Sequence, residues 1–269
     1  MKIDLCDVTF MIPVRVDSMI RLENLVMCVD YLQKHFQTNI HILEAAAYRN
    51  NIIPSVVRGK EINYTFLEDK DPVFYKTRYL NIMTSQVMTP IVGIWDADIL
   101  VDKKQIIEAV NQLRKKSCEI AYPYNGDFMD TSAILRAYYW QHRDFRFLNR
   151  HRSMMKALYS VEGKVESVGG AIFVMTDKYI EAGGDSERFY GWGMEDGERH
   201  LRWVSFGYRI FRSRGCLYHL SHPRDMNGHF RSSQHRLKAT NDTNYVLDLT
   251  AEELKEYIRY QNFPSLPSR

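Results

Sequence analysis

The chain has 269 residues, enough for one large α/β domain or two small ones with a substantial core. Its apolar share of 45%, charged share of 26% and net charge of +3 are ordinary for a globular protein, and so mild a charge does not indicate a nucleic-acid-binding protein. No apolar run approaches the length of a membrane span, and the amino terminus lacks a signal-like apolar segment. The four scattered cysteines show no CxxC or zinc-type spacing, so we expect a cytoplasmic protein with reduced thiols.

The first 123 residues alternate short apolar runs with amphipathic segments. We expect strands at 8–13, 40–44, 90–95 and 119–123, and helices at 21–37, 75–88 and 103–116. Strands that alternate with helices in this way form βαβ units, so the pattern predicts a Rossmann-like, mostly parallel central sheet flanked by helices.

The pattern changes after residue 123. Residues 125–164 are aromatic and basic with few strand signals, which predicts a subdomain of helices and loops. Further strands are expected at 169–175, 208–211 and 216–219, and further helices at 176–182, from about 195 to 206 and at 250–261. Residues 223–244 are polar and rich in His and Arg, so we expect a mobile loop there.

The distribution of charge is uneven. Between Arg199 and Lys238 every charged residue is basic except Asp225. Such a segment suits a phosphate, a pyrophosphate or an anionic membrane surface. We therefore expect peripheral contact with the inner face of a membrane.

The first candidate site is Asp96-Ala97-Asp98, which directly follows the apolar run Pro90–Trp95. In open α/β sheets, ligands bind where the parallel strands end. Two carboxylates at such an end are hard oxygen ligands, suited to Mg²⁺ or Mn²⁺. Taken alone, the pair is equally typical of a helix cap or a turn with solvated acids.

The second candidate is the segment Gly191-Trp192-Gly193-Met194-Glu195-Asp196. Its glycines permit close approach of the backbone to a ligand, and Trp192 offers a flat apolar face. Glu195 and Asp196 fall in the first turn of the expected helix, where the helix dipole favours negative charge. The segment predicts either a well-capped helix or a carboxylate base beside a sugar-stacking platform.

The third candidate is His219-Leu220-Ser221-His222, after the last expected strand. Two imidazoles three residues apart can converge on one metal, and a site that mixes imidazole with carboxylate suits Mn²⁺ better than Mg²⁺. A fourth group, Arg15 with Lys76 and Arg78, supplies cations that could hold a nucleotide diphosphate.

Together these blocks resemble the nucleotide-sugar glycosyltransferases of the GT-A fold, and most closely the β-1,4-galactosyltransferase family and its bacterial relatives. The blocks that carry the resemblance, in the family's order, are Ile12–Arg15, Trp95–Asp98, Val168–Ala171 leading into Tyr190–Asp196, and His219–Asp225. The resemblance spans residues 8–228. It implies a single GT-A domain over 1–269, with a nucleotide-binding half at 1–123 and an acceptor-binding half at 124–269.

The resemblance also implies roles for individual residues. Asp98 and His222 would hold the metal, with His219 as a third ligand where those galactosyltransferases carry a methionine. Asp196 would be the catalytic base, with Glu195 beside it in contact with a sugar. The donor-binding residues would be Pro13, Arg15, Lys76, Arg78, Asp96, Trp192 and Gly193. The sequence departs from the family at Met194, where a glycine is common, and at Gly197, where the animal enzymes carry an acid.

The function that the resemblance implies is a metal-dependent inverting transfer of a hexose or N-acetylhexosamine from a UDP-sugar. The acceptor would be a glycan or a lipid-linked saccharide in polysaccharide assembly, and the cofactor Mn²⁺, with Mg²⁺ as the alternative. Residues 223–244 would close over the bound donor. Two other functions stay open: a non-catalytic carbohydrate-binding or scaffold protein of a polysaccharide assembly complex, and a nucleotidylyltransferase. The latter normally carries a glycine-rich loop after its first strand, whereas Val14–Ser18 contains no glycine.

Overall fold

The computed structural model describes residues 1–160, 162, 166–224 and 226–260, and its centre is a seven-stranded sheet with the order β10-β6-β9-β4-β1-β2-β3. The elements in chain order are β1 (Ile3–Val14), α1 (Met19–His35), β2 (Phe36–Ala46), α2 (Ile52–Val56), β3 (Ile62–Glu68), α3 (Lys76–Thr84), β4 (Ile91–Trp95), β5 (Ile99–Val101), α4 (Lys103–Arg114), β6 (Ile120–Tyr122), β7 (Phe128–Asp130), α5 (Ala133–His142), α6 (Phe145–Arg150), η1 (Arg152–Met154), β8 (Lys156–Tyr159), β9 (Ala171–Met175), α7 (Thr176–Glu181), α8 (Glu195–Ser205), β10 (Ile210–Arg212), β11 (Leu217–His219), η2 (Met226–Gly228), α9 (Ser233–Leu247) and α10 (Ala251–Tyr260).

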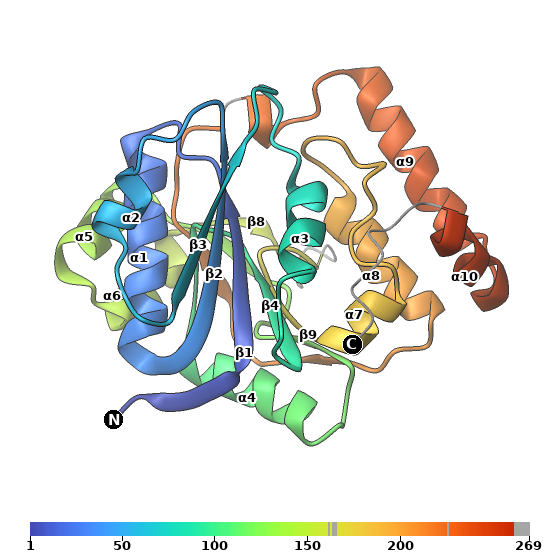
Figure 1. The fold of residues 1–269 in the computed structure, drawn as a ribbon. Coiled ribbons are helices and arrows are strands. Elements are labelled where there is room, and N and C mark those ends of the chain that lie inside the picture. Colours follow the sequence, from blue (N-terminus) through green and yellow to red (C-terminus); the bar gives the residue numbers. More distant parts are fainter. Residues whose placement is uncertain (161, 163–165, 225, 261–269) are drawn as a thin grey trace.

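The central sheet is parallel except at β9. Strands β3, β2, β1 and β4 pair in parallel, as do β6 and β10, whereas β9 runs antiparallel to both β4 and β6. Right-handed crossovers place the helix between β1 and β2 and the helix between β3 and β4 on opposite faces of the sheet. Figure 1 shows this arrangement, with α1 on one side of the strands and α3 on the other. The predicted mostly parallel α/β fold is confirmed.

A second sheet, with the order β5-β11-β7-β8, brings the ends of distant segments together. Strand β11 pairs antiparallel with β5, which follows Asp98 directly, and parallel with β7. In addition, the Leu220 N–H donates to the Asp98 carbonyl at 2.8 Å. This sheet therefore carries His219 and His222 to the end of β4.

The expected strands and helices of the first 123 residues are present, but several short elements lack a clear sequence signal. Strands β3, β7 and β8 are not predicted by the hydrophobic pattern, because β3 mixes polar with apolar residues and the other two are only three or four residues long. The subdomain expected at 125–164 contains helices α5 and α6, as predicted, together with these two strands.

The prediction of a loop over 223–244 is wrong for its second half, which lies in helix α9. Ser232 caps this helix by accepting from the His235 N–H at 3.0 Å. Its buried side chains are Ala239, Asp242, Thr243 and Val246, so small and polar groups replace the apolar stripe that marks a helix in a sequence. Residues 229–232, between η2 and α9, keep the irregular structure expected of them.

The basic segment 199–238 is less exposed than its composition indicates. Arg199 and Arg202 are fully buried, and Arg209 is paired with Glu119 at 2.5 Å. Within the described residues, no helix has both the length and the apolar character needed to cross a membrane.

Candidate functional site

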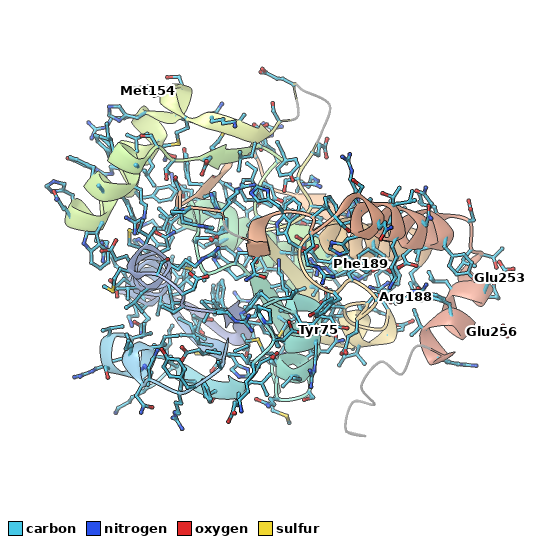
Figure 2. All side chains as sticks on the ribbon, turned by 90° about the horizontal axis from the view of Figure 1, so that it is seen from above. Tyr75, Met154, Arg188, Phe189, Glu253 and Glu256 are labelled. Atoms are coloured by element: carbon cyan, nitrogen blue, oxygen red, sulfur yellow. The ribbon has the colours of Figure 1, made fainter. Side chains whose placement is uncertain are left out.

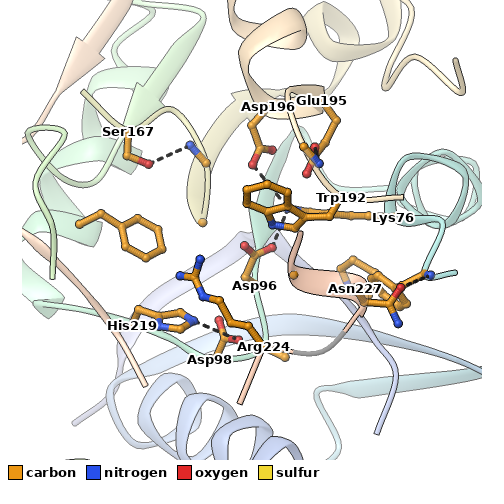
Figure 3. A pocket seen from close by; sticks show the side chains of 18 of the residues that line it. Lys76, Asp96, Asp98, Ser167, Trp192, Glu195, Asp196, His219, Arg224 and Asn227 are labelled. Carbon is orange, nitrogen blue, oxygen red and sulfur yellow. Dashed lines mark hydrogen bonds and ion pairs between the residues drawn. The ribbon is translucent and has the colours of Figure 1, made fainter. Parts of the chain in front are cut away.

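A cavity of about 440 Å³ opens at the carboxyl ends of β1 and β4, where the sequence predicts a site. Its lining includes Pro13, Arg15, Asn24, Phe74, Lys76, Asp96, Asp98, Phe128, Tyr159, Gly169, Trp192, Gly193, Glu195, Asp196, His219, His222, Arg224, Asn227 and Phe230. Figure 3 shows Asp98 and His219 at one end of this cavity, with Asp196 and Glu195 at the other and Asp96 between them. The three predicted motifs therefore share one cavity.

Asp98, His219 and His222 form a cluster that can hold a metal. One ligand atom from each lies within 4.8 Å of the other two. The Nε2 atom of His222 lies 3.1 Å from Asp98 Oδ2, and that of His219 lies 3.6 Å from the same oxygen. Burial acts to raise the pKa of the Asp98 carboxyl, but the two imidazoles lower it well below its usual range. The cluster thus presents an ionised carboxylate and two ring nitrogens to one point, which fits a transition metal that accepts mixed ligands.

Lys76 links the two groups of acids. Its ammonium lies 2.8 Å from Asp96 Oδ1 and 3.7 Å from Asp196 Oδ2, although α3 and α8 are far apart in the chain. Burial acts to lower the pKa of Lys76, and the two carboxylates raise it above its usual range. Burial raises the pKa of Asp96 despite the opposing charge of Lys76. Lys76 therefore stays charged and attracts two partly buried acids to one point.

Asp196 and Glu195 are adjacent in the chain, but their pKa values are shifted in opposite directions. Arg199 donates from Nη2 to Asp196 Oδ1 at 2.5 Å. Burial acts to raise the pKa of Asp196, but Lys76 and Arg199 together lower it below its usual value. Burial and the charge of Asp196 raise the pKa of Glu195 to about 7. Asp196 is thus ionised at neutral pH. Its Oδ1 is hydrogen-bonded to Arg199, and its Oδ2 is the oxygen nearest Lys76.

Two glycines let the backbone come close to this centre. A Cβ on Gly169 would lie 2.2 Å from Asp196 Oδ2, so the Val168–Ala171 segment fits against the carboxylate only without a side chain. Gly193 has φ +116°, a backbone conformation that glycine adopts readily, and a Cβ there would lie 2.6 Å from the Phe230 ring. The Gly193 N–H donates to Glu195 Oε2 at 2.8 Å, which holds Glu195 in place.

The side of the cavity at the end of β1 is shaped by Arg15. Its Nε donates to the Ala45 carbonyl at 2.8 Å, and its Nη1 donates to the carbonyls of Asp71 and Pro72 at 2.7 and 3.0 Å. The guanidinium also lies over the Phe74 ring. Because its donors are largely engaged with the backbone, Arg15 holds the walls of the cavity together rather than offering free donors to a phosphate.

Arg78 does not join the site. It is exposed and is absent from the cavity lining. Residues two apart on a helix point in nearly opposite directions, so Lys76 and Arg78 cannot face one cavity from α3. The prediction that Arg78 binds the donor is not supported by this geometry.

The cavity also contains groups that the sequence does not single out. Phe74, Phe128 and Tyr159 add aromatic surface, Asn24 and Asn227 add amides, and Arg224 adds a cation. Asp130, outside the lining, accepts from His219 at 2.7 Å. Arg224 belongs to the His219–Asp225 block, although the sequence gives it no role, and the others belong to no motif.

A family model described as the N-terminal domain of galactosyltransferase matches residues 150–225, which contain both Gly191–Asp196 and His219–His222. A comparison with curated protein sequences found no match.

Solved structures resemble the whole chain. A mannosyltransferase from Pyrobaculum calidifontis, in complex with GDP-Man and Mn²⁺, superposes with a TM-score of 0.57 at 18% identity, over 94% of this chain and 68% of that one. The catalytic domain of Drosophila β1,4-galactosyltransferase 7, in complex with xylobiose, gives a TM-score of 0.51 at 14% identity, over 86% of this chain and 78% of that one. The fold is that of the GT-A glycosyltransferases.

A third GT-A structure is glucosyl-3-phosphoglycerate synthase from Mycobacterium tuberculosis, in complex with Mn²⁺, UDP-Glc and phosphoglyceric acid. It gives a TM-score of 0.54 at 12% identity, over 88% of this chain and 79% of that one. The GT-A neighbours thus differ in donor nucleotide and in donor sugar. The GT-A fold by itself therefore does not identify a donor.

Because the pKa of Glu195 is raised in the folded protein, we expect its contribution to the free energy of unfolding to depend on pH. Because the folded-state pKa is raised from 4.5 to about 7, the protonated carboxyl favours folding below pH 4.5, and this contribution is lost as the pH rises through 7. Glu195→Gln places a neutral amide at this position. Its effect on the free energy of unfolding should therefore be more favourable at pH 8 than at pH 5, by up to about 3 kcal/mol.

Urea unfolding of the metal-free protein at pH 5 and pH 8 measures this difference. Glu68→Gln, at an exposed glutamate of β3, serves as the control. An identical effect of Glu195→Gln at both pH values would contradict the account of a buried proton.

Proposed function

We propose that the protein is a metal-dependent inverting glycosyltransferase that moves a hexose or N-acetylhexosamine from a UDP-sugar to a hydroxyl of a glycan or a lipid-linked saccharide. The observation that carries the proposal is that Asp196 shares one cavity with the Asp98, His219 and His222 cluster. A transferase of this kind needs both a group that accepts the hydroxyl proton and a site that neutralises the departing diphosphate.

The cofactor we propose is Mn²⁺, held by Asp98, His222 and His219. One carboxylate with two imidazoles suits Mn²⁺ better than Mg²⁺, which prefers oxygen ligands. The mannosyltransferase and the glucosyl-3-phosphoglycerate synthase named above were solved with Mn²⁺ and nucleotide sugars, which supports the choice. When bound, the ion supplies Lewis-acid stabilisation of the diphosphate leaving group.

The chain's own residues account for the remaining chemistry. Asp196 Oδ2 removes the proton of the acceptor hydroxyl, and that oxygen attacks the anomeric carbon from the side opposite the leaving diphosphate, which inverts the configuration. Arg199 fixes the other oxygen of Asp196, so the carboxylate keeps its orientation during the transfer. Trp192, partly exposed in the cavity, offers its face to a sugar ring, and Lys76 binds the charged donor beside Asp96.

A panel of nucleotide sugars, tested with and without Mn²⁺, separates this proposal from its alternatives. Release of UDP that requires both Mn²⁺ and an acceptor supports the transferase. Binding of a saccharide without turnover of any donor would favour a carbohydrate-binding or scaffold protein instead. Release of pyrophosphate from UTP with a sugar phosphate would favour a nucleotidylyltransferase.

Asp196→Asn should lower kcat by about 10²- to 10⁴-fold, since an amide cannot accept the proton. Mn²⁺ and UDP should bind as they do to the unmodified protein, because Asp196 is not in the metal cluster. Steady-state kinetics and calorimetric titration measure the two quantities.

The matched control is Asp177→Asn, at an exposed acid in the first turn of α7. Full transfer activity in Asp196→Asn would remove the base assignment, while the metal cluster would stand.

We propose that residues 226–232 act as a lid. The side chain of Asn227 ties this segment to the loop before α3. Its Oδ1 accepts from the Phe74 N–H at 2.8 Å, and its Nδ2 donates to the Pro72 carbonyl at 3.2 Å. Phe230 packs edge-on against Trp192, and Arg231 lies over the Tyr190 ring. The segment thus closes across the cavity through a few polar contacts and one aromatic contact, an arrangement that opens at low cost.

Mn²⁺ with UDP should protect this segment from cleavage by trypsin at Arg231, since the bound diphosphate favours the closed arrangement. Limited proteolysis followed by mass spectrometry locates the cut. Cleavage at Arg209, exposed in the turn before β10, gives the internal reference rate. An unchanged rate at Arg231 with saturating Mn²⁺ and UDP would count against the lid.

We also propose that the enzyme works in the cytoplasm at the inner face of the membrane, through the surface formed by α6, η1 and the start of β8. Arg146, Arg150, Arg152 and Lys156 are exposed there, and Met154 is 71% exposed. Figure 2 shows Met154 at the outer edge of the molecule. Basic groups around an exposed apolar side chain suit anionic lipid.

Vesicles that contain phosphatidylglycerol should therefore sediment the protein at low salt, and vesicles of phosphatidylcholine alone should not. Arg150→Glu combined with Arg152→Glu should abolish the sedimentation. Equal sedimentation of this variant would rule out the surface.

A further inference from the structure

Asp130 is an acid that belongs to none of the motifs and does not line the cavity, yet it contacts the metal cluster. It is the last residue of β7. Its Oδ1 lies 2.7 Å from Nδ1 of His219, and the imidazole is buried at 7% exposure. The same imidazole reaches towards Asp98 with its other nitrogen. His219 therefore lies between two carboxylates, one inside the cavity and one behind it.

The pairing of Asp130 with His219 is set by the backbone. Strands β7 and β11 run parallel, and their register places Asp130 directly opposite His219. The next residue strengthens the alignment, because the Thr131 N–H donates to the His219 carbonyl at 2.9 Å and Thr131 Oγ1 accepts from the Ser221 N–H at 3.0 Å. These backbone and side-chain bonds between Thr131, His219 and Ser221 hold the Asp130 carboxylate beside the ring.

This contact decides which ring nitrogen faces the cavity. An ionised carboxylate can only accept, so Nδ1 of His219 donates to Asp130, and Nε2 is the nitrogen that would ligate a metal. His222 reaches the same state by another route, because its Nδ1 donates to the Pro223 carbonyl at 2.8 Å. Both imidazoles therefore present Nε2 towards Asp98 Oδ2, one oriented by a carboxylate and the other by a carbonyl.

We propose that Asp130 is a positioning residue that makes His219 the third protein ligand of the metal. A carboxylate behind a ligating imidazole fixes the ring and increases the basicity of the opposite nitrogen, and loss of such a partner commonly weakens metal binding about 10- to 100-fold. The inference rests on the proposed function only in that a divalent cation binds the Asp98 cluster.

A purely structural role for Asp130 makes a different prediction. A buried histidine paired with an acid can stabilise β7 against β11 without touching a metal. In that case replacement of Asp130 would lower the melting temperature and leave the affinity for Mn²⁺ of the folded protein unchanged. Metal affinity and stability therefore need to be measured separately on the same variants.

The experiment is a double-mutant cycle on Mn²⁺ affinity, with Asp130→Ala, His219→Ala and the variant that carries both. The electron paramagnetic resonance signal of free Mn²⁺ gives the dissociation constant at fixed pH, without donor and again with UDP. We expect Asp130→Ala to weaken binding about 10- to 100-fold, and the double variant to bind no more weakly than His219→Ala alone, since Asp130 acts through that ring.

Two further variants sharpen the comparison. Asp130→Asn keeps an acceptor oxygen for Nδ1 and should lose less affinity than Asp130→Ala. Asp7→Ala removes a carboxylate that is paired with Arg114 at 2.6 Å and does not line the cavity, and it should leave the affinity unchanged. Melting temperatures of the metal-free variants establish that each one is folded.

Each outcome bears on one proposal. If the unmodified protein binds Mn²⁺ and Asp130→Ala binds it equally well, the inference is wrong and the metal site of the proposed function stands. Additive losses in the double variant would show that Asp130 does not act through His219, which also overturns the inference. If the unmodified protein binds no Mn²⁺ with or without UDP, the metal-dependent function fails, and the role of Asp130 fails with it.

Discussion

The site depends on the contact of one buried lysine with two carboxylates. Lys76 lies between Asp96, at the end of β4, and Asp196, at the start of α8. Even partly buried acids are costly when they have no partner, and these two come from different halves of the chain. The ammonium makes it possible to bring both acids to one cavity. It thereby joins the two sides of the site from which we propose that the donor and the acceptor bind.

Asp98, Asp196 and Glu195 each have a further cationic or proton-donating partner. Asp98 faces two imidazoles, and Asp196 is held from behind by Arg199, which is fully buried and also pairs with the buried Asp185. Glu195 accepts from a backbone N–H instead. Burial and the charge of Asp196 raise the pKa of Glu195, whereas Lys76 and Arg199 lower that of Asp196. Fixed partners of this kind orient the carboxylates before any substrate arrives, which is the condition for electrostatic catalysis without reorganisation.

The motifs could be predicted from the sequence because each of them directly follows or begins a strongly patterned element. Asp96 and Asp98 follow a fully buried strand, and Asp196 opens a helix after two glycines. Asp130 could not be predicted, since β7 has only three residues and its partner lies 89 positions away. The sequence does not show which of the two cations, Lys76 or Arg78, faces the cavity, because this depends on the rotation of α3 about its axis. Helix α9 was hidden because its buried side has small and polar side chains, which carry no apolar periodicity.

The two positions where the chain departs from the galactosyltransferases it resembles, Met194 and Gly197, line the cavity beside Asp196. Met194 has φ +69°, a conformation that glycine adopts more readily, and its Sδ accepts from Thr240 of α9 at 3.5 Å. A side chain is thus retained there despite backbone strain, and it ties the start of α8 to α9. At Gly197, which lines the cavity, an added Cβ would meet nothing within 4 Å. If the acceptor binds beside Asp196, as we propose, the open space at Gly197 is where differences between acceptors are most easily accommodated.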